Sequence, residues 1–591
     1  MSMGSSPAGL PWGPRRVKNR AFTSLGLRLG SVFLGLITGV AGADLYAGDA
    51  AAPVCTSCHE QGQKLAKSAH AALTCDTCHE SHEKVPHPAN IPKPACIACH
   101  ADQAGDYDQS VHGQARKGGN EGAPDCSLCH GGAHELLAPK SQAFRGAVPD
   151  TCGMCHTEVV DQFRSSVHGT ALARGVTQAP LCTDCHGEHK ILKHTNAASP
   201  VNVSHIRDTC GSCHGNVRLT RKFGMPSDRL VSFDSSFHGL AAKSGSQTVA
   251  NCASCHGVHN ILPSSDPKSM VNAKNLPKTC GKCHEGAGTR FTISQVHVAE
   301  GSTEPEALKW VRQFYLLIIP VTIGLMLLHQ GGDWFRKLIR LRFQKPRAIH
   351  LVHAAGHAGY GAGYGADHGA DREIRMLPFE RIQHAVLAIS FLTLVWTGFA
   401  LKYPDQWWAR PLLLLEGAHS MRSLIHRVAA AVFIGVSVTH LVSLIVSRSL
   451  RDHWKEMLPN ANDPREALSG FAYNLGLGDH PPVRSPHSYV EKAEYWAVVW
   501  GAIVMISSGA LLWADNLSMK LLPKAWLDIS TSIHFYEALL ATLAIVVWHF
   551  YSIIFDPDVY PLNTAFLTGK TVKKQASLTE HQKPPVPAAG D

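Results

Sequence analysis

Residues 55–59 read CTSCH, and this Cys-x-x-Cys-His pentad occurs nine times in the first half of the 591-residue chain. All 18 cysteines of the sequence belong to these pentads, so none is left over. A disulfide framework or a structural zinc site does not place one histidine directly after every second cysteine. The nine pentads are Cys55/Cys58/His59, Cys75/Cys78/His79, Cys96/Cys99/His100, Cys126/Cys129/His130, Cys152/Cys155/His156, Cys182/Cys185/His186, Cys210/Cys213/His214, Cys252/Cys255/His256 and Cys280/Cys283/His284.

This spacing is typical of covalent haem attachment. The two thiols form thioethers to the haem, and the histidine that follows them is the proximal ligand of the iron. We therefore expect nine c-type haems. A stretch of about 250 residues leaves little chain for a conventional apolar core, so we expect short helices and long loops packed around the macrocycles.

The remaining histidines of this region repeat in register with the pentads. Five follow a pentad by 11 to 24 residues, mostly within a Ser-x-His element, and four lie three or four residues beyond their own pentad. Nine candidates for nine irons predict bis-histidine ligation, which suits electron transfer and leaves no open position for a substrate. The candidates are His70, His112, His168, His238 and His297 in the first class, and His82, His134, His189 and His259 in the second.

The spacing does not show which distal histidine serves which haem. Three histidines of the region, His87, His194 and His205, are spare. His87 competes with His82, and His205 is an alternative to His238, whose distance from its own pentad is the longest.

The second half of the chain is apolar. Five segments, at approximately 311–330, 382–401, 426–447, 495–514 and 533–555, are long enough to span a bilayer of about 30 Å. Basic residues cluster after the first, third and fifth, which places those flanks in the cytoplasm and the pentads in the periplasm. A basic stretch followed by an apolar run predicts a signal peptide or membrane anchor at residues 1–43. We expect a bacterial inner-membrane protein.

Histidines inside the spans are costly in lipid and indicate function. His426 and His440 lie 14 residues apart on the third span, and His534 and His549 lie 15 apart on the fifth. Each pair returns to nearly the same helix face after a rise of about 21 Å, as expected for two stacked b-type haems in a helical bundle. The outer haem takes His426 and His534. The inner haem takes His549 with either His384 or His440.

Residues 376–560 resemble the four-helix dihaem cytochrome b subunits of membrane hydrogenases and formate dehydrogenases. The residues that carry the resemblance are Phe379, Arg381 and His384 in the pattern Phe-x-Arg-x-x-His, then His426, His534 and His549. It implies that His384, rather than His440, pairs with His549. Nine pentads ahead of such a domain resemble the Cbc-type inner-membrane nonahaem cytochromes of metal-reducing bacteria. That resemblance implies menaquinol oxidation and electron delivery to periplasmic c-type cytochromes, eventually to extracellular acceptors.

We therefore expect a quinol oxidoreductase that is also an electron conduit. Glu491, Lys492, Glu494 and His440 are the candidates for a quinone site that exchanges protons near the inner b haem. The alternative for both glutamates is a solvated helix start. Three other functions stay open: reverse flow from a periplasmic donor to quinone, a membrane-anchored electron store without a quinone site, and a terminal reductase with an open haem.

The predicted fold is mostly α, with a loop-rich multihaem cytochrome c domain followed by a transmembrane helical bundle. The expected division is a signal or anchor (1–43), a nonahaem domain (44–305), a linking transmembrane helix (306–345), a Gly/His-rich cytoplasmic linker (346–375), a dihaem cytochrome b domain (376–560) and a cytoplasmic tail (561–591). The formal charge of +9 omits the haem propionates, so lipid and not nucleic acid is the expected partner. The sequence allows a homo-oligomer.

Overall fold

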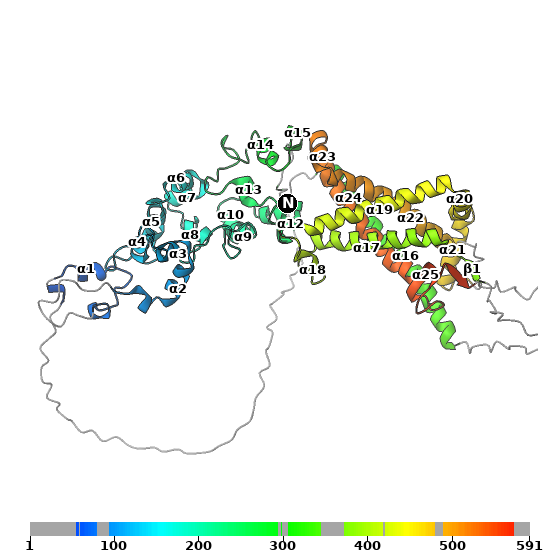
Figure 1. Cartoon of the computed structure of the whole chain (residues 1–591), viewed down its shortest axis with the longest axis horizontal. Helices are drawn as coiled ribbons and strands as arrows, with labels where there is room; N and C mark the ends of the chain where they lie inside the picture. The colour runs from blue at the N-terminus through cyan, green and yellow to red at the C-terminus, as the bar shows by residue number, and fades with distance from the viewer. Residues whose placement is uncertain are drawn as a thin grey trace, which may run out of the picture.

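The computed structural model describes residues 55–57, 59–79, 94–292, 297, 305–343, 372–417, 420–478 and 488–572. The fold class is confirmed: these residues are mostly helical, and five of their helices are long and apolar enough to cross a membrane. Figure 1 shows a chain of short helices running up to a bundle of long ones. Cys58, His82, His87, the predicted signal or anchor and most of the Gly/His-rich linker lie outside the described residues.

Short helices and turns make up the N-terminal part, as the density of pentads predicts. Each pentad coincides with a helical turn or begins in the last turn of a longer helix. The elements are η1 (Cys55–Ser57), α1 (Gln61–Leu65), η2 (Cys75–Thr77), η3 (Cys96–Ala98), α2 (Ala101–Gln109), α3 (Val111–Lys117), α4 (Cys126–His130), α5 (Gln142–Gly153), α6 (Thr157–Ser165), α7 (Val167–Ala173), α8 (Cys182–His186), α9 (Ile206–His214), α10 (Val217–Lys222), α11 (Arg229–Ser235), α12 (Phe237–Lys243), α13 (Cys252–His256), α14 (Leu276–Gly281) and α15 (Thr289–Thr292).

Five long helices form the bundle: α16 (Glu306–Phe343), α17 (Pro378–Lys402), α19 (Met421–Val446), α22 (Tyr489–Trp513) and α24 (Lys524–Ala544). Two π-helical stretches, η5 (Ile545–His549) and η6 (Tyr551–Phe555), extend α24. α17 packs on α19, and α22 and α16 both pack on α24. Large apolar side chains stay exposed along these helices, including Leu317 (68%) and Val446 (77%). Such surfaces are rare in water-soluble proteins, so they indicate contact with lipid.

Each of the five predicted spans coincides with one of these helices. Shorter elements connect them: α18 (Arg410–Leu413), α20 (Arg448–Trp454), η4 (Lys455–Met457), α21 (Asp463–Asn474) and α23 (Asp515–Leu521). α16, expected to link the two parts, also packs along α24 and against α21. The bundle therefore has a fifth helix beyond the four of the predicted cytochrome b domain.

The start of the predicted tail folds back onto the bundle. α25 (Ala565–Thr568) leads into β2 (Lys570–Val572), which pairs antiparallel with β1 (Arg372–Ile374) just before α17. Gly569 has a φ of 75°, and a Cβ there would lie 2.6 Å from the Met376 carbonyl oxygen. The sequence did not predict this ribbon, because three-residue strands show no measurable alternation of apolar and polar residues.

The two parts of the chain meet at the end of the bundle where α22 leads into α24. α12 contacts α17, while α15 contacts α23 and α24, and these elements lie side by side in Figure 1. The backbone approaches most closely at Gly286, where an added Cβ would lie 1.9 Å from the Asn516 carbonyl oxygen. Glycine is therefore required at this contact.

We expect Gly286→Ala to loosen this contact. Its methyl group must displace backbone, and overpacking of this kind costs about 1 to 3 kcal/mol. Amides of α23 should then exchange hydrogen about tenfold faster or more, as measured by mass spectrometry. Gly288→Ala is the matched control, because a Cβ at Gly288 meets nothing within 4 Å. Equal exchange in both variants would contradict the assigned contact.

Candidate functional site

The predicted haem-attaching cysteines are free thiols in the part of the chain that the structure describes, but their surroundings differ. About half are partly covered by neighbouring residues, and the rest are exposed to solvent. The partly covered thiols are Cys55, Cys75, Cys152, Cys182, Cys185, Cys210, Cys252, Cys255 and Cys280. The exposed thiols are Cys78, Cys96, Cys99, Cys126, Cys129, Cys155, Cys213 and Cys283.

Cys99, Cys155 and Cys283 depart from a site enclosed by protein. Each is exposed and lies in a turn just beyond its helix, because η3, α5 and α14 end at or before the preceding residue. Few large apolar side chains are buried in this part, so little protein is at hand to cover these thiols. A thioether is a covalent bond that needs no enclosing pocket, and haem attachment at these three cysteines stays a prediction.

Backbone hydrogen bonds still keep these three pentads compact. The N–H groups of Cys99, Cys155 and Cys283 each donate to the carbonyl of the first cysteine at 3.2 or 3.3 Å. The N–H of the histidine that follows donates to the same carbonyl at 2.9 or 3.0 Å. Both cysteines and the histidine therefore share one turn of backbone here, as they do in the fully helical pentads.

Pairs of histidine rings face one another throughout the N-terminal part. Each pair joins one pentad histidine to one predicted distal histidine, and the ring centroids lie 6.0 to 6.3 Å apart. His59 is described, but its candidates His82 and His87 are not. The eight pairs are His70–His100, His79–His134, His112–His156, His130–His189, His168–His214, His186–His259, His238–His284 and His256–His297.

The ring separation suits an iron between the two imidazoles. A ring nitrogen lies about 2.0 Å from the metal it binds and about 1 Å from its own ring centroid, which gives roughly 6 Å between centroids. Aromatic pairs in direct contact range over about 4.5 to 7 Å, whereas all eight pairs fall between 6.0 and 6.3 Å. The side chains present therefore fit a bis-histidine haem at each pair.

The pairing is not local. His70 follows the first pentad but faces His100 of the third, and the other Ser-x-His histidines up to His238 likewise face a pentad two places further along. The described histidines of the second class each face a pentad two places earlier in the sequence. His134, for example, follows the fourth pentad and faces His79 of the second. Each pair thus ties together segments that a further pentad separates in sequence.

A recurring Ser-x-His-Gly turn positions three of the distal histidines. Ser110, Ser166 and Ser236 cap α3, α7 and α12, and each side chain accepts the backbone N–H three residues on. That third residue is glycine each time, because a Cβ there would lie 2.0 to 2.1 Å from a backbone oxygen of the preceding helix. The histidine between them is held in the first turn of its helix.

Burial keeps several of these imidazoles neutral, which is the form that binds a metal. It lowers the pKa of His168 to about 4, with a further contribution from His214. Burial also lowers the pKa of His238, next to His284 and Lys524. The spare His205 has another role: its Nε2 lies 2.9 Å from the Ala197 carbonyl oxygen, and it is His238 that faces His284.

Two more pairs lie inside the bundle. His426 on α19 and His534 on α24 have ring centroids 6.4 Å apart, and His384 on α17 and His549 on η5 lie 6.1 Å apart. His440 faces neither, because its ring nitrogens lie 3.2 Å from the Tyr495 hydroxyl and 3.4 Å from Gln383 Oε1. Of the two alternatives for the inner haem, the geometry therefore favours His384.

Helix hydroxyls set the tautomer of the outer pair. Thr397 Oγ1 donates to the Thr393 carbonyl at 2.7 Å, so at 2.8 Å it can only accept from Nδ1–H of His426. Ser508 Oγ likewise donates to the Val504 carbonyl and lies 3.0 Å from Nδ1 of His534. Both arrangements leave the Nε2 lone pair free for a metal.

A serine hydroxyl also contacts Nδ1 of His297 in the N-terminal part. Ser232 Oγ donates to the Arg229 carbonyl at 2.9 Å and lies 3.0 Å from His297 Nδ1. In the bundle, the inner-pair His549 instead has Nδ1 3.2 Å from Glu494 Oε2. None of these hydroxyls stands out in the sequence, because serine and threonine at i−4 spacing are common in helices.

Small residues make room beside the outer histidine pair, whereas an apolar cavity between α17 and α19 has none of the paired histidines in its lining. A Cβ at Gly509 would lie 3.2 Å from His534 Cε1, and one at Gly398 would lie 3.5 Å from His426 Cε1. A cavity of about 440 Å³ opens between α17 and α19, lined mainly by apolar side chains. Arg422 is 4% exposed and lies one helical turn before His426, and its Nε has no hydrogen-bond partner among the described residues. Arg422 also pairs with the buried Glu416 at 3.6 Å, so the fit to a b-type haem rests on the facing imidazoles and the small residues beside them.

The structure places the four quinone-site candidates in different surroundings. Glu494 is the only one of them in contact with a paired histidine among the described residues, through His549. Glu491 closes a capping box at the start of α22 and forms an ion pair with Arg375. Lys492 is buried and lies 2.9 Å from Asp463. His440 contacts Tyr495, as described above.

Comparison with known families identifies the bundle. Residues 375–565 match the family model of the prokaryotic cytochrome b561. This region is therefore a membrane-bound b-type cytochrome that transfers electrons, and the haem that it implies is b-type. No curated protein and no solved structure matches the chain.

We expect Thr397→Val to weaken the outer haem site without unfolding the bundle. The substitution keeps the shape but removes the hydroxyl that fixes His426, and losses of this kind lower metal affinity by about 10- to 100-fold. Haem b retention during dilution, followed by absorbance, measures the effect. Thr531→Val is the control, because Thr531 also donates one turn back, to Leu527, but is exposed. Equal haem loss in both variants would contradict the assigned role.

Proposed function

We propose that the chain is an inner-membrane quinol oxidoreductase that takes electrons from menaquinol through two b haems and passes them along nine bis-histidine c haems to periplasmic cytochromes. The observation that carries the proposal is the set of ten facing histidine pairs among the described residues, eight in the N-terminal part and two in the bundle. Bound haems supply one-electron chemistry, and the protein supplies their position and environment.

Neighbouring pentads lie side by side in sequence order, which supports a single line of haems. The Cys152 thiol contacts Cys182, and the Cys210 thiol contacts Cys252. Cys185 interacts with Cys213, and Cys255 with Cys280. Electrons that enter at the ninth pentad would therefore pass the eighth, seventh, sixth and fifth in turn.

The ninth pentad lies against the bundle. His284 Nδ1 is 3.5 Å from Asp515 Oδ2 at the start of α23, and Lys524 at the start of α24 interacts with His238. His534, of the outer b pair, lies ten residues further along α24. This contact supports electron transfer between the outer b haem and the ninth c haem.

The inner pair supports a quinol site on the cytoplasmic side. With a haem held by the inner pair to supply one-electron chemistry, the Glu494 carboxylate next to His549 would take the proton from a quinol hydroxyl. The saturated pairs argue against a terminal reductase, which needs an open iron. Reverse flow and electron storage are the outcomes that the experiment below separates from quinol oxidation.

Replacing one distal histidine should open one haem and leave all of them attached. In His134→Ala the thioethers to Cys75 and Cys78 remain, so the covalent haem count by intact mass should not change. One haem should become high-spin in the ferric state and bind carbon monoxide when reduced. His205→Ala is the control and should leave every haem low-spin. An unchanged spin state in His134→Ala would contradict the pairing.

Anaerobic rapid mixing with a reduced menaquinone analogue tests the proposed function. We expect the b absorption bands to be reduced first and the c bands to follow, because the quinol site adjoins the inner b haem. His549→Ala should abolish both phases, although dithionite still reduces the c haems. If neither band of the unmodified protein responds to quinol while dithionite reduces all haems, the quinol oxidoreductase proposal is wrong.

A further inference from the structure

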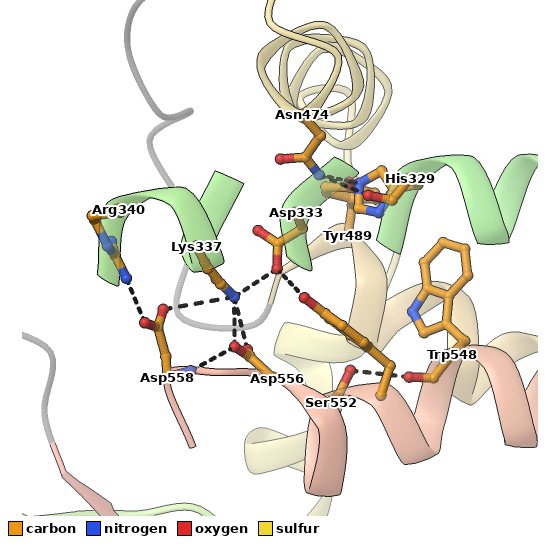
Figure 2. Close-up of polar contacts among 11 residues, drawn as sticks. His329, Asp333, Lys337, Arg340, Asn474, Tyr489, Trp548, Ser552, Asp556 and Asp558 are labelled. Atoms are coloured by element: carbon orange, nitrogen blue, oxygen red, sulfur yellow. Dashed lines mark hydrogen bonds and ion pairs between the residues drawn. The ribbon is translucent and has the colours of Figure 1, made fainter. Parts of the chain in front are cut away.

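One face of α16 carries a line of titratable residues that the sequence analysis did not single out. His329, Asp333, Lys337 and Arg340 follow one another at intervals of four, four and three residues. That spacing places them on the same side of the helix. Figure 2 shows them facing η5, η6 and the segment with Asp556 and Asp558 that follows. Charged groups on a membrane helix are costly and indicate function.

The line begins at the level of the inner haem pair. The His329 ring stacks on Trp548, with centroids 5.7 Å apart and planes 4° from parallel, and Trp548 directly precedes His549. The Tyr489 hydroxyl lies 2.5 Å from His329 Nε2. Asn474 Nδ2 donates to the His329 carbonyl at 3.2 Å. The His329 ring is thus held by residues of α21, α22 and η5 together.

From Asp333 onward, acidic and basic groups contact one another in turn. The Tyr551 hydroxyl donates to Asp333 Oδ2 at 2.6 Å, and Lys337 Nζ lies 2.6 Å from the same carboxylate. Lys337 Nζ also lies 2.8 Å from Asp556 and 3.6 Å from Asp558. Arg340 forms an ion pair with Asp558. The dashed contacts in Figure 2 connect these groups from Asp333 to Arg340.

Exposure rises along the line toward the end of α16. The side chains of Lys337 and Asp333 are 11% and 12% exposed, Asp556 and Asp558 are 16% and 20% exposed, and Arg340 is 50% exposed. By the positive-inside rule, the basic end of α16 faces the cytoplasm. The groups therefore run from the buried level of the inner haem pair to cytoplasmic water.

A purely structural clamp between α16 and residues 556–558 would not need these groups. Replacing a buried ion pair with apolar residues of similar volume is often neutral or stabilising. A purely structural contact between α16 and residues 556–558 also would not involve His329, which lies one helical turn further into the membrane. Arg336, the other base on this stretch, points elsewhere, with its guanidinium 3.9 Å from the Tyr473 ring centroid.

We propose that this line, His329, Asp333, Lys337, Asp556 and Asp558, conducts protons from the inner quinol site to the cytoplasmic face. The proposal rests on the quinol oxidation proposed above. Oxidation of one quinol breaks two O–H bonds, yields the quinone, sends two electrons singly to the haems and leaves two protons for the line. His329 and Asp333 are one helical turn apart, an interval that one bridging water spans.

The side on which protons emerge is the test. The full-length haem-loaded protein is placed in vesicles that hold the dye pyranine, valinomycin and potassium, with the N-terminal part outside as shown by protease access. A permeant menaquinol analogue is the donor, and external ferricyanide accepts the electrons without taking up protons. We expect two protons inside for each quinol consumed. Empty vesicles give the background from direct reaction of quinol with ferricyanide.

Asp333→Asn should slow both internal acidification and b-band reduction about tenfold or more, because the amide keeps the shape but cannot carry a proton. Asp333→Glu should restore both rates. Haem content and the dithionite-reduced spectrum should match those of the unmodified protein. Asp528→Asn is the matched control: like Asp333, Asp528 pairs with a lysine one helical turn away, Lys524, but at the opposite end of the bundle.

Three results would overturn the proposal. In the first, the protons appear outside the vesicles. In the second, the Asp333→Asn variant reacts at the rate of the unmodified protein. In the third, the Asp333→Asn variant loses haem and stability and Asp333→Glu does not restore them, which is the behaviour expected of a purely structural contact. If the unmodified protein oxidises quinol and one of these results follows, only the proton line is wrong. If the unmodified protein does not react with quinol, the proposed function fails first and the proton line falls with it.

Discussion

The spacing of two imidazole rings about 6 Å apart is the constraint on which the rest of the structure depends. In the described N-terminal part, few apolar side chains are fully buried, and most of those are small or on separate helices. Segments that lie two pentads apart in the sequence therefore meet through their histidine pairs and not through an apolar core. Metal binding and folding are coupled where the site does not exist in the unfolded chain. If the proposed c haems bind at these pairs, haem insertion and folding of this part would occur together.

The same ring spacing recurs in the bundle, where lipid replaces water as the surroundings. There the ligands need support from neighbouring helices, and Thr397, Ser508 and Glu494 supply it through Nδ1 of His426, His534 and His549. α16 adds a fifth helix that packs along α24 and brings ionisable side chains to the inner end. The backbone contact at Gly286 places the N-terminal part, with its histidine pairs, against the bundle that carries the other two pairs.

The sequence was sufficient for the parts of the site that local spacing determines. The pentads, the distal candidates and the five spans are all local patterns, and the helices lie where the patterns predict. Spacing could not predict that His70 faces His100 or that His134 faces His79, because those pairings depend on the path of the whole chain. The same limit applies to exposure, since identical pentads leave the Cys155 thiol open to solvent and the Cys185 thiol partly covered.

The supporting hydroxyls, the β1–β2 ribbon and the line on α16 were missed for the same reason. Each becomes visible only when distant segments are brought together.

The haem stoichiometry of the purified protein decides whether the histidine pairs hold haems. Pyridine haemochrome spectra distinguish c-type from b-type haem, and the intact mass counts the covalently attached haems. The account predicts nine c haems and two b haems per chain, with every iron low-spin. Fewer than nine covalent haems, a single b haem or a high-spin iron in the unmodified protein would contradict it, because at least one of the predicted haem sites would then not hold a saturated iron.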